Sequence, residues 1–276
     1  MPQMWNSTPV LIIGAGRAGR TLSSMLSTSG ITVSGIVGRQ SADERRAELG
    51  RVADSGTAFQ LVFAVQDDLL PEVTQEFGKL RSDWSSALVW HCAGGVPRTV
   101  LSPFAERGAE TAVLHPCYPI SSPLASLPRG RIVAYTLEAG PTCLSYFEEL
   151  VDSWEGVLIT VSNLQRELYH AGNVLAAGHV VSLLLAAEHT LTRSGLRKES
   201  AHAVIRSLIA GSTANLERVV DGGESLGSIL TGPFVRDDIK VIRRQHGALQ
   251  QLLPELGELY TLLGKLGVSL KMQERS

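Results

Sequence analysis

The sequence lacks several features that mark whole classes of protein. Its 276 residues contain only three cysteines, Cys92, Cys117 and Cys143, without the C-x-x-C spacing of a metal site. Three cysteines are too few for a disulfide framework, so we expect reduced thiols, a cytoplasmic protein and no metal. The formal net charge is −2, without the basic excess that is typical of nucleic-acid-binding proteins. No nucleic-acid partner is therefore expected.

Long hydrophobic runs are scarce as well. The amino terminus has no basic segment, and its apolar run is interrupted by Gly14, so a signal peptide is not expected. Residues 171–187 carry no formal charge, but they lie at the short limit of the ~17–25 residues of a membrane span and include polar side chains. A helix that is apolar around most of its surface also suits a domain core or a subunit interface. We interpret this stretch as a core helix and expect no membrane partner.

The length of the chain exceeds what one hydrophobic core usually organises, which predicts two domains. In residues 1–162, short apolar runs alternate with helical patterns and end in glycine, proline or polar residues. The predicted strands cover residues 10–13, 31–37, 61–65, 87–91, 111–114, 131–137 and 157–161. This alternation predicts an α/β fold, a Rossmann-like doubly wound parallel sheet.

Residues 163–276 have a different pattern. Apolar residues recur there at helical spacing, and the predicted helices cover residues 163–194, 198–220, 237–247 and 253–267. We therefore expect an all-α carboxyl-terminal domain after the sheet.

A glycine-rich turn follows the first predicted strand. Its six residues form a Gly-x-Gly-x-x-Gly pattern: Gly14, Ala15, Gly16, Arg17, Ala18 and Gly19. Gly14 permits a tight turn, Gly16 lets the backbone approach a pyrophosphate, and Gly19 lets helix and strand pack closely. The helix that follows presents free N–H groups and the positive end of its dipole. Such turns also serve S-adenosylmethionine sites or close packing, but a strand before and a helix after favour a dinucleotide.

The end of the second predicted strand indicates which dinucleotide. NAD-selective folds place an Asp or Glu there to hold the ribose 2′-hydroxyl. This chain has Gly38, Arg39, Gln40 and Ser41 instead. The planar guanidinium of Arg39 can pair with a 2′-phosphate, although a solvated surface arginine is the alternative. We therefore expect NADP (NADPH), with Gly38, Arg39 and Ser41 among the cofactor-binding residues.

Ligands of doubly wound sheets bind beyond the carboxyl ends of the strands. This rule adds Val65, Gln66 and Ala93 to the expected cofactor-binding residues and draws attention to two histidines, His91 and His115. Histidine can donate or accept a proton near neutral pH. His115 begins a stiff loop with two prolines, where it either transfers a proton or holds the loop. For His91 we favour a hydrogen bond to the backbone.

Polar residues also interrupt the apolar helix at the start of the second predicted domain. His170 and Asn173 are three residues apart, and Tyr169 and Asn173 are four apart, so either pair can share one helix face. Such groups are either hydrogen-bonded inside the packed helices or face a cleft. We expect His170 first, and His115 second, to handle the proton of a substrate, with Asn173 as an orienting partner.

Together these motifs resemble the Rossmann-like oxidoreductases with a helical DUF2520 domain. This group is related to 6-phosphogluconate and β-hydroxyacid dehydrogenases, ketopantoate reductase and pyrroline-5-carboxylate reductase. Besides the glycine turn, the resemblance rests on Val65-Gln-Asp-Asp68, His91-Cys-Ala-Gly94, His115-Pro116, Tyr169-His170 and Leu230-Thr-Gly-Pro233 with Arg236. It implies a nicotinamide cofactor and a dimer that packs its helical domains together.

The chain departs from this pattern in three ways. Gly178 stands where the group commonly has asparagine, while Asn173 is particular to this chain. Gln66 stands where the group commonly has proline, and the helix that carries His170 has no lysine where β-hydroxyacid dehydrogenases use one. The lysine-assisted mechanism therefore cannot be transferred to this chain. The sequence predicts an NADP(H)-dependent oxidoreductase for an unidentified small carbonyl, imine or hydroxyl compound, forming a homodimer through its helical domain. A non-catalytic NADP(H)-binding sensor or scaffold is the alternative, and methyl transfer is a weaker one.

Overall fold

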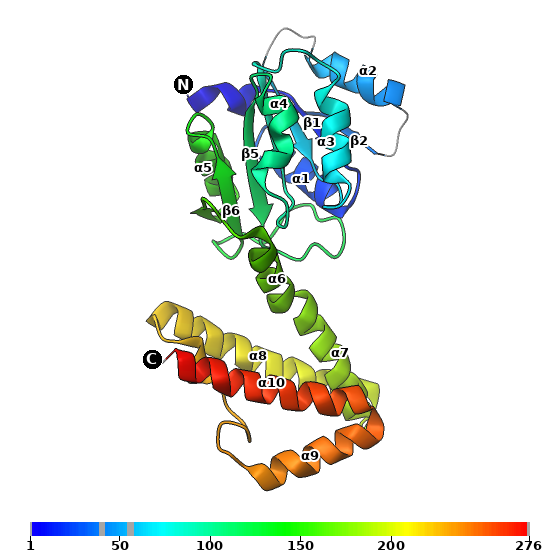
Figure 1. Cartoon of the computed structure of the whole chain (residues 1–276), viewed down its shortest axis with the longest axis vertical. Helices are drawn as coiled ribbons and strands as arrows, with labels where there is room; N and C mark the ends of the chain where they lie inside the picture. Colours follow the sequence, from blue (N-terminus) through cyan, green and yellow to red (C-terminus); the bar gives the residue numbers. More distant parts are fainter. Residues whose placement is uncertain (1, 39–41, 54–57, 275–276) are drawn as a thin grey trace. The chain divides into compact units, whose positions relative to one another are not determined.

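The computed structural model describes residues 2–38, 42–53 and 58–274 (Figure 1). The chain divides into two compact units, Met1–Ala177 and Gly178–Ser276. The first unit contains the sheet and also the helix α6 (Arg166–Ala176). The residues of interest around the sheet therefore belong to one unit.

The first unit contains the expected α/β sheet. Its strands are β1 (Val10–Ile13), β2 (Val33–Val37), β3 (Phe59–Phe63), β4 (Ala87–His91), β5 (Glu110–Pro116), β6 (Ala134–Ala139) and β7 (Val157–Thr160), in the order β2-β1-β3-β4-β5-β6-β7. Its helices are α1 (Arg17–Thr28), α2 (Ala42–Ala53), α3 (Leu70–Gly78), α4 (Ser102–Ala105), α5 (Leu144–Ser153) and α6, with short 3-10 turns at Pro2–Ser7 and Arg98–Leu101. The strand predicted at 61–65 lies two residues earlier, so Val65 and Gln66 are loop residues beyond its end.

The sheet is mostly parallel, as predicted for a doubly wound fold, and one pair of neighbouring strands is antiparallel. Strands β1 to β5 are parallel, but β6 runs antiparallel to β5, with Leu137 opposite Leu114. A parallel connection needs a crossover, usually a helix, and residues 117–133 between these strands form none. The chain therefore returns in the opposite direction. Helix α5 then provides a crossover, and β7 is parallel to β6.

The central strands of the sheet are buried on both faces. Along β4, Leu88 and Trp90 point into a core that includes residues of α1 and α5, whereas Ala87 and Val89 point into a core with residues of α2, α3 and α4. Successive side chains of a strand point to opposite faces, so a strand buried on both faces is apolar throughout. This is why the strands appear in the sequence as continuous apolar runs.

The second unit is helical, as expected. Its helices are α7 (Gly178–Arg193), α8 (Lys198–Gly222), α9 (Ile239–Leu252) and α10 (Pro254–Gln273), with a 3-10 turn at Leu226–Ile229. Helix α10 packs against α9, and α8 packs against α7. The segment before α9 fits closely against α10, since a Cβ on Gly264 would lie 2.4 Å from the ring of Phe234 and one on Gly267 would lie 3.2 Å from a methyl group of Leu230.

The single helix predicted over residues 163–194 is wrong, because the chain breaks at Ala177. The φ and ψ angles of Ala177 are −121° and −75°, so α6 ends there and α7 begins at Gly178. By length and composition the stretch Arg166–Arg193 could cross a membrane, and none of its apolar window is buried. The interpretation of residues 171–187 as a core helix is therefore wrong for the single chain. Its second part, α7, has 16 residues and spans about 24 Å, which is less than the ~30 Å of a bilayer core.

Candidate active site

The three glycines of the turn after β1 have different surroundings. Gly14 has a φ of 123°, and a Cβ there would lie 2.2 Å from the carbonyl oxygen of Ala64. A Cβ on Gly19 would lie 1.8 Å from the carbonyl oxygen of Gly14. Gly16, by contrast, has no neighbour within 4 Å of its Cβ position. Gly14 and Gly19 are therefore required by packing, while Gly16 leaves open space at the start of α1.

The amino terminus of α1 is suited to an anion. The helix begins at Arg17, has no acidic residue in its first turn and has no side-chain cap. The N–H groups of its first turn, including that of Ala18, have no acceptor within the helix and lie at its positive end. Arg20 Nε donates to the Ala15 carbonyl at 3.0 Å, and Arg17 Nη1 donates to the Ser121 carbonyl at 3.2 Å. These two arginines hold the turn and a neighbouring loop.

Other expected cofactor-binding residues lie next to the turn. A Cβ on Gly38 would lie 3.4 Å from the Cβ of Ala15, and the backbone nitrogen of Val65 is 3.2 Å from the Cβ position of Gly14. Gln66, the next residue, is exposed. The ends of β2 and β3 therefore border the glycine turn.

The residues after β4 are tied to the backbone. Nδ1 of His91 accepts a hydrogen bond from the N–H of Ala93 at 3.2 Å, and both residues are buried. Burial lowers the pKa of His91 to about 3, so this imidazole is neutral at physiological pH. The backbone role predicted for His91 is confirmed. Arg39 and Ser41, the residues expected to read the 2′-phosphate corner, lie outside the described residues.

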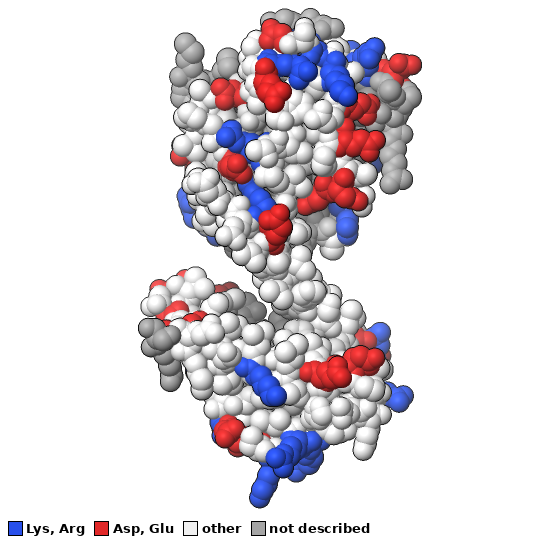
Figure 2. Space-filling model, viewed as in Figure 1, with Lys and Arg blue, Asp and Glu red and all other residues white. Residues whose placement is uncertain are grey.

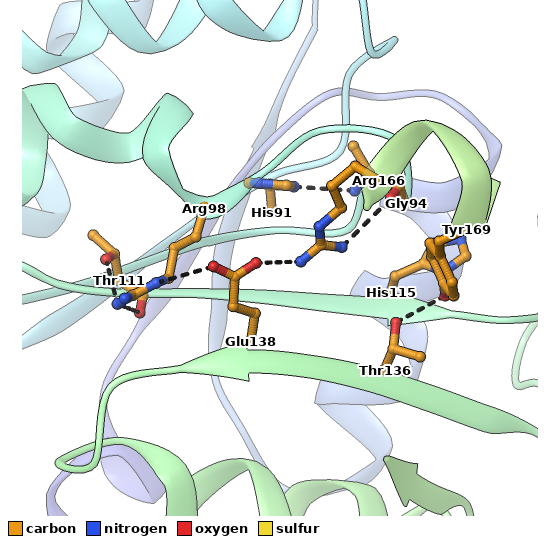
Figure 3. Close-up of polar contacts among 10 residues, drawn as sticks. His91, Gly94, Arg98, Thr111, His115, Thr136, Glu138, Arg166 and Tyr169 are labelled. Carbon is orange, nitrogen blue, oxygen red and sulfur yellow. Dashed lines mark hydrogen bonds and ion pairs between the residues drawn. The ribbon is translucent and has the colours of Figure 1, made fainter. Parts of the chain in front are cut away.

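A hydrogen-bonded cluster joins β5, β6 and α6. The hydroxyl of Tyr169 lies 2.6 Å from Nδ1 of His115 and 2.8 Å from the hydroxyl of Thr136 (Figure 3). It also lies 3.2 Å from the thiol of Cys117. Burial, with the nearby charges of His170 and Arg166, lowers the pKa of His115 to about 4. Burial raises the pKa of Tyr169 to about 12. At neutral pH the imidazole is therefore uncharged and the phenol keeps its proton.

A charge network around one buried arginine lies beside this cluster. The guanidinium of Arg166 is 4% exposed, forms an ion pair with Glu138 and donates through Nη1 to the Gly94 carbonyl at 3.4 Å (Figure 3). The other oxygen of Glu138 lies 3.7 Å from Nε of Arg98. Arg98 Nη1 donates to the Thr111 carbonyl at 3.4 Å. One carboxylate on β6 thus links two arginines from different parts of the unit.

Two glycines let side chains approach the loop after β4. A Cβ on Gly94 would lie 2.8 Å from Nε2 of His115. A Cβ on Gly95 would lie 2.9 Å from Oδ2 of Asp67 and 3.4 Å from Cγ of His170. Nδ1 of His170 is buried and has no hydrogen-bond partner among the described residues. The backbone of Gly94 and Gly95 is therefore bordered by three side chains. These are the carboxylate of Asp67, the imidazole of His170 with its unpartnered Nδ1, and the imidazole of His115.

The structure brings together His115 and His170, the two histidines expected to handle a proton. Asn173 is engaged locally, because its Nδ2 donates to the Tyr169 carbonyl of the same helix at 3.0 Å. Sequence reasoning missed Arg166 and Glu138. One signal for Arg166 was available: it is three residues before Tyr169, at a helix start where the dipole disfavours a cation.

The second unit contains a Gly-x-Ser-x-Gly pattern at residues 223–227. A nucleophilic serine in this pattern sits between a strand and a helix. Here the pattern follows helix α8, and the hydroxyl of Ser225 accepts from the N–H of Gly227 at 3.1 Å and bonds to Glu274. Ser225 therefore caps the 3-10 turn Leu226–Ile229.

Comparisons with known proteins agree with this architecture. A family model for a Rossmann-like domain matches residues 6–116, and a model for a domain of unknown function, DUF2520, matches residues 133–266. A comparison with curated protein sequences found no match. The candidate site draws on both matched regions, since His115 belongs to the first, while Arg166 and His170 belong to the second.

Solved structures of oxidoreductases have a similar fold. A Bacteroides fragilis protein assigned as an NADP oxidoreductase is similar over 94% of this chain and 97% of its own, with 18% identity and a TM-score of 0.72. An imine reductase from Streptomyces aurantiacus is similar over 98% of this chain and 100% of its own, with 11% identity and a TM-score of 0.62. A Plasmodium falciparum pyrroline carboxylate reductase with NADP bound is similar over 95% of this chain and 99% of its own, with 14% identity and a TM-score of 0.58. The chain therefore carries a Rossmann-like domain followed by a DUF2520 domain, as its motifs indicated, in the fold of the oxidoreductases to which it is similar.

Proposed function

We propose that the protein is an NADP(H)-dependent oxidoreductase that acts on a small carbonyl, imine or hydroxyl compound. One observation carries this proposal: the open glycine turn and the cluster of His115, Tyr169 and His170 lie beyond the carboxyl ends of parallel strands of one sheet. Doubly wound sheets bind their ligands at this edge. The functions named for the similar structures support the same reaction class.

The residues of the turn fit a dinucleotide. Gly16 leaves its Cβ position empty, and α1 presents unpaired N–H groups without a competing acidic side chain. The choice of NADP over NAD rests on Arg39, which replaces the acid of NAD-selective folds. A bound nicotinamide supplies the hydride chemistry, so the chain itself must orient the substrate and handle one proton.

For that proton we propose His170 first and His115 second. His170 offers a buried, unpartnered Nδ1 beside Gly95, whereas Nδ1 of His115 is already bonded to Tyr169. The phenol of Tyr169 keeps its proton at neutral pH and can replace a proton that His115 gives up. The side chain of Asn173 donates a hydrogen bond to the Tyr169 carbonyl of the same helix and so stabilises α6.

The test begins with titration of the full-length protein with NADPH and with NADH, followed by nicotinamide fluorescence. The NADPH complex is then mixed with cyclic imines, keto acids and aldehydes, and loss of nicotinamide absorbance is measured. We expect tighter binding of NADPH and oxidation by at least one class of compound. Binding without oxidation by any compound or cell-extract fraction would favour the sensor or scaffold instead.

The assignment of His170 has a matched control. His170→Ala should lower turnover ~100-fold or more, which is the usual range for loss of a general acid. His189 lies exposed on α7, and His189→Ala should leave turnover unchanged. Full turnover of His170→Ala would remove this residue from the mechanism.

We further propose a homodimer formed through the second unit. Its four helices surround an apolar groove of about 1260 Å³, lined by residues such as Leu183, Leu208, Leu249 and Leu263. Large exposed apolar patches commonly mark contact surfaces. Light scattering after size-exclusion chromatography should give twice the mass of one chain, and a monomer at micromolar concentration would contradict the proposal.

A further inference from the structure

Arg166 occupies a position that two physical rules disfavour. It is the first residue of α6, where the positive end of the helix dipole repels a cation, and it is 4% exposed. Arginine is almost never fully buried unless it is paired. Glu138 supplies the pairing, and the Gly94 carbonyl accepts a further hydrogen bond. Residues that break local rules are expected where function or strain requires them.

The ion pair is one half of a two-point attachment between β6 and α6. Thr136 and Glu138 are two residues apart on β6, so they point to the same face of the strand. Their partners on α6, Tyr169 and Arg166, are three residues apart and share one face of the helix. A single contact would fix only the distance of α6 from the sheet. Two contacts along the helix also fix its rotation about its own axis.

The rotation of α6 decides where His170 lies. Consecutive residues of a helix are about 100° apart around the axis, so a modest rotation would carry the His170 ring away from Gly95. We infer that Arg166 is a positioning residue: held by Glu138, its guanidinium fixes the Gly94 carbonyl and the rotation of α6, so that Tyr169 meets His115 and His170 lies over Gly95. This inference rests on the proposed function, in which these side chains handle the proton of a substrate.

Arg166 also contributes to the electrostatic surroundings of His115. The groups that face His115 are Arg166, Tyr169 and His170 from α6, together with His91 from β4 and Cys117 from its own loop. The guanidinium adds to burial in disfavouring a second proton on this imidazole. Loss of the guanidinium should therefore raise the pKa of His115, which gives the inference a readout that does not depend on turnover.

Arg98 provides the matched control. Its guanidinium shares the carboxylate of Glu138 but bonds to Thr111, and no contact of Arg98 with α6 or with Gly94 is among those of the described residues. A role that is merely structural would make Arg166→Met and Arg98→Met differ only in stability. A positioning role makes them differ in chemistry.

The test compares these two variants in the full-length protein with three measurements: affinity for NADPH, turnover with the best substrate of the panel, and the pKa of His115 by NMR, assigned with His115→Gln. For Arg166→Met we expect kcat to fall ~100-fold, because small displacements of reacting groups have effects of this size. We also expect unchanged NADPH affinity and a raised pKa of His115. Arg98→Met should keep kcat and the pKa of His115.

Two further variants separate charge from geometry. Arg166→Lys keeps a positive charge but cannot bond Glu138 and the Gly94 carbonyl with one planar group, so the pKa of His115 should stay low while kcat falls. Arg166→Met with Glu138→Gln also removes the carboxylate that has lost its main partner and should fold, yet remain slow. Full kcat in Arg166→Met or in the double variant would overturn the inference, as would an equal loss of kcat in Arg98→Met. If no substrate turns over, the proposed function fails, while an unchanged pKa of His115 in Arg166→Met overturns the inference separately.

Discussion

The two units of the chain bury their apolar residues in different ways. In the first unit, side chains such as Leu11, Val89 and Trp90 are completely buried on the two faces of the sheet. In the second unit, Ala201 and Val219 are the buried apolar residues among those described, while leucines such as Leu208 are about two-thirds exposed (65%). Figure 2 shows a broad uncharged surface on this unit.

This difference follows from architecture. A sheet with helices on both sides closes its core within one unit, whereas a few helices with apolar surface on several sides leave part of it uncovered. The first unit therefore has the properties of a self-sufficient domain, and the second has those of a surface that a second copy would complete. Substitutions in the two units should therefore differ in their effects.

The largest effect, a loss of cofactor binding in addition to stability, is expected in the glycine turn of the first unit. A Cβ in Gly19→Ala would meet the Gly14 carbonyl oxygen at 1.8 Å, so the backbone must shift. Overpacking of this kind costs about 1–3 kcal/mol or more, and we expect NADPH affinity to be lost as well. The added Cβ in Gly16→Ala would have no atom within 4 Å. The free energy of unfolding of this variant should therefore stay within about 0.5 kcal/mol of that of the parent.

Gly16→Ala should still bind NADPH at least ~10-fold more weakly, because its Cβ occupies the space where a pyrophosphate approaches the backbone. Chemical denaturation gives the stability of both variants, and nicotinamide fluorescence gives their affinity. Parental affinity in Gly16→Ala would place the cofactor elsewhere.

The second prediction compares two leucines. Leu61 is fully buried in β3, and Leu61→Ala should lower the free energy of unfolding by about 2–5 kcal/mol. Leu208→Ala, on the open surface of α8, should change the stability of the single chain by less than about 0.5 kcal/mol. Leu208 lines the groove of the second unit, so Leu208→Asp should instead convert the dimer to a monomer.

Leu168→Asp is the control for the charge itself, because Leu168 is exposed to a similar extent (69%) but belongs to α6 of the first unit. Its mass in light scattering should equal that of the parent. If both aspartate variants leave the mass unchanged, the groove of the second unit is not the dimer surface.

The third prediction concerns the stability of the first unit at acidic pH. The pKa of His115 is lowered to about 4 and that of His91 to about 3, both chiefly by burial, against ordinary values near 6.5. The unfolded chain therefore binds more protons below pH 6.5, and the stability of the first unit is complete above that pH. It falls as pH drops from 6.5 towards 4, by up to about 1.4 kcal/mol per pH unit for each histidine.

Tryptophan fluorescence can assign this loss of stability to the first unit. All four, Trp5, Trp84, Trp90 and Trp154, belong to the first unit, so their fluorescence reports its unfolding alone. Denaturant midpoints from this signal should decrease between pH 6.5 and 4. A His91→Gln, His115→Gln variant should show a shallower slope, and an unchanged slope would mean that other groups cause the loss.

Local patterns made much of the first unit predictable from sequence. The turn at Gly14 and the strand at Val10–Ile13 depend on steric rules that act within a few residues. The direction of β6 was not predictable in this way, because the connection after β5 has no periodic pattern that shows how the chain returns. The break at Ala177 was hidden because apolar spacing continues through it.

The candidate site was predictable only in part for a similar reason. His115 and His170 stood out because a titratable group at a strand end, or on an apolar helix, is unusual. Arg166 did not stand out, since its partner Glu138 is 28 residues away and only folding brings them together. Local sequence indicates which side chains need a partner, and the tertiary fold decides which partner they find.

The smallest effect is expected from an ion pair of the second unit. Glu188 on α7 lies 3.2 Å from Nζ of Lys198 and 2.7 Å from Nε2 of His202, both on α8, and both partners are exposed. Water and salt screen such pairs, so Glu188→Gln should move the melting temperature by no more than about 1 °C. Glu138→Gln removes the partner of the buried Arg166, and a buried charge left unpaired costs about 3–5 kcal/mol, or on the order of 10 °C. Two glutamates that are exposed to a similar extent thus differ in effect because Glu138 compensates a buried arginine, whereas the partners of Glu188 are exposed. A large shift in Glu188→Gln at low salt would show that the second unit depends on its surface charges more than its exposure indicates.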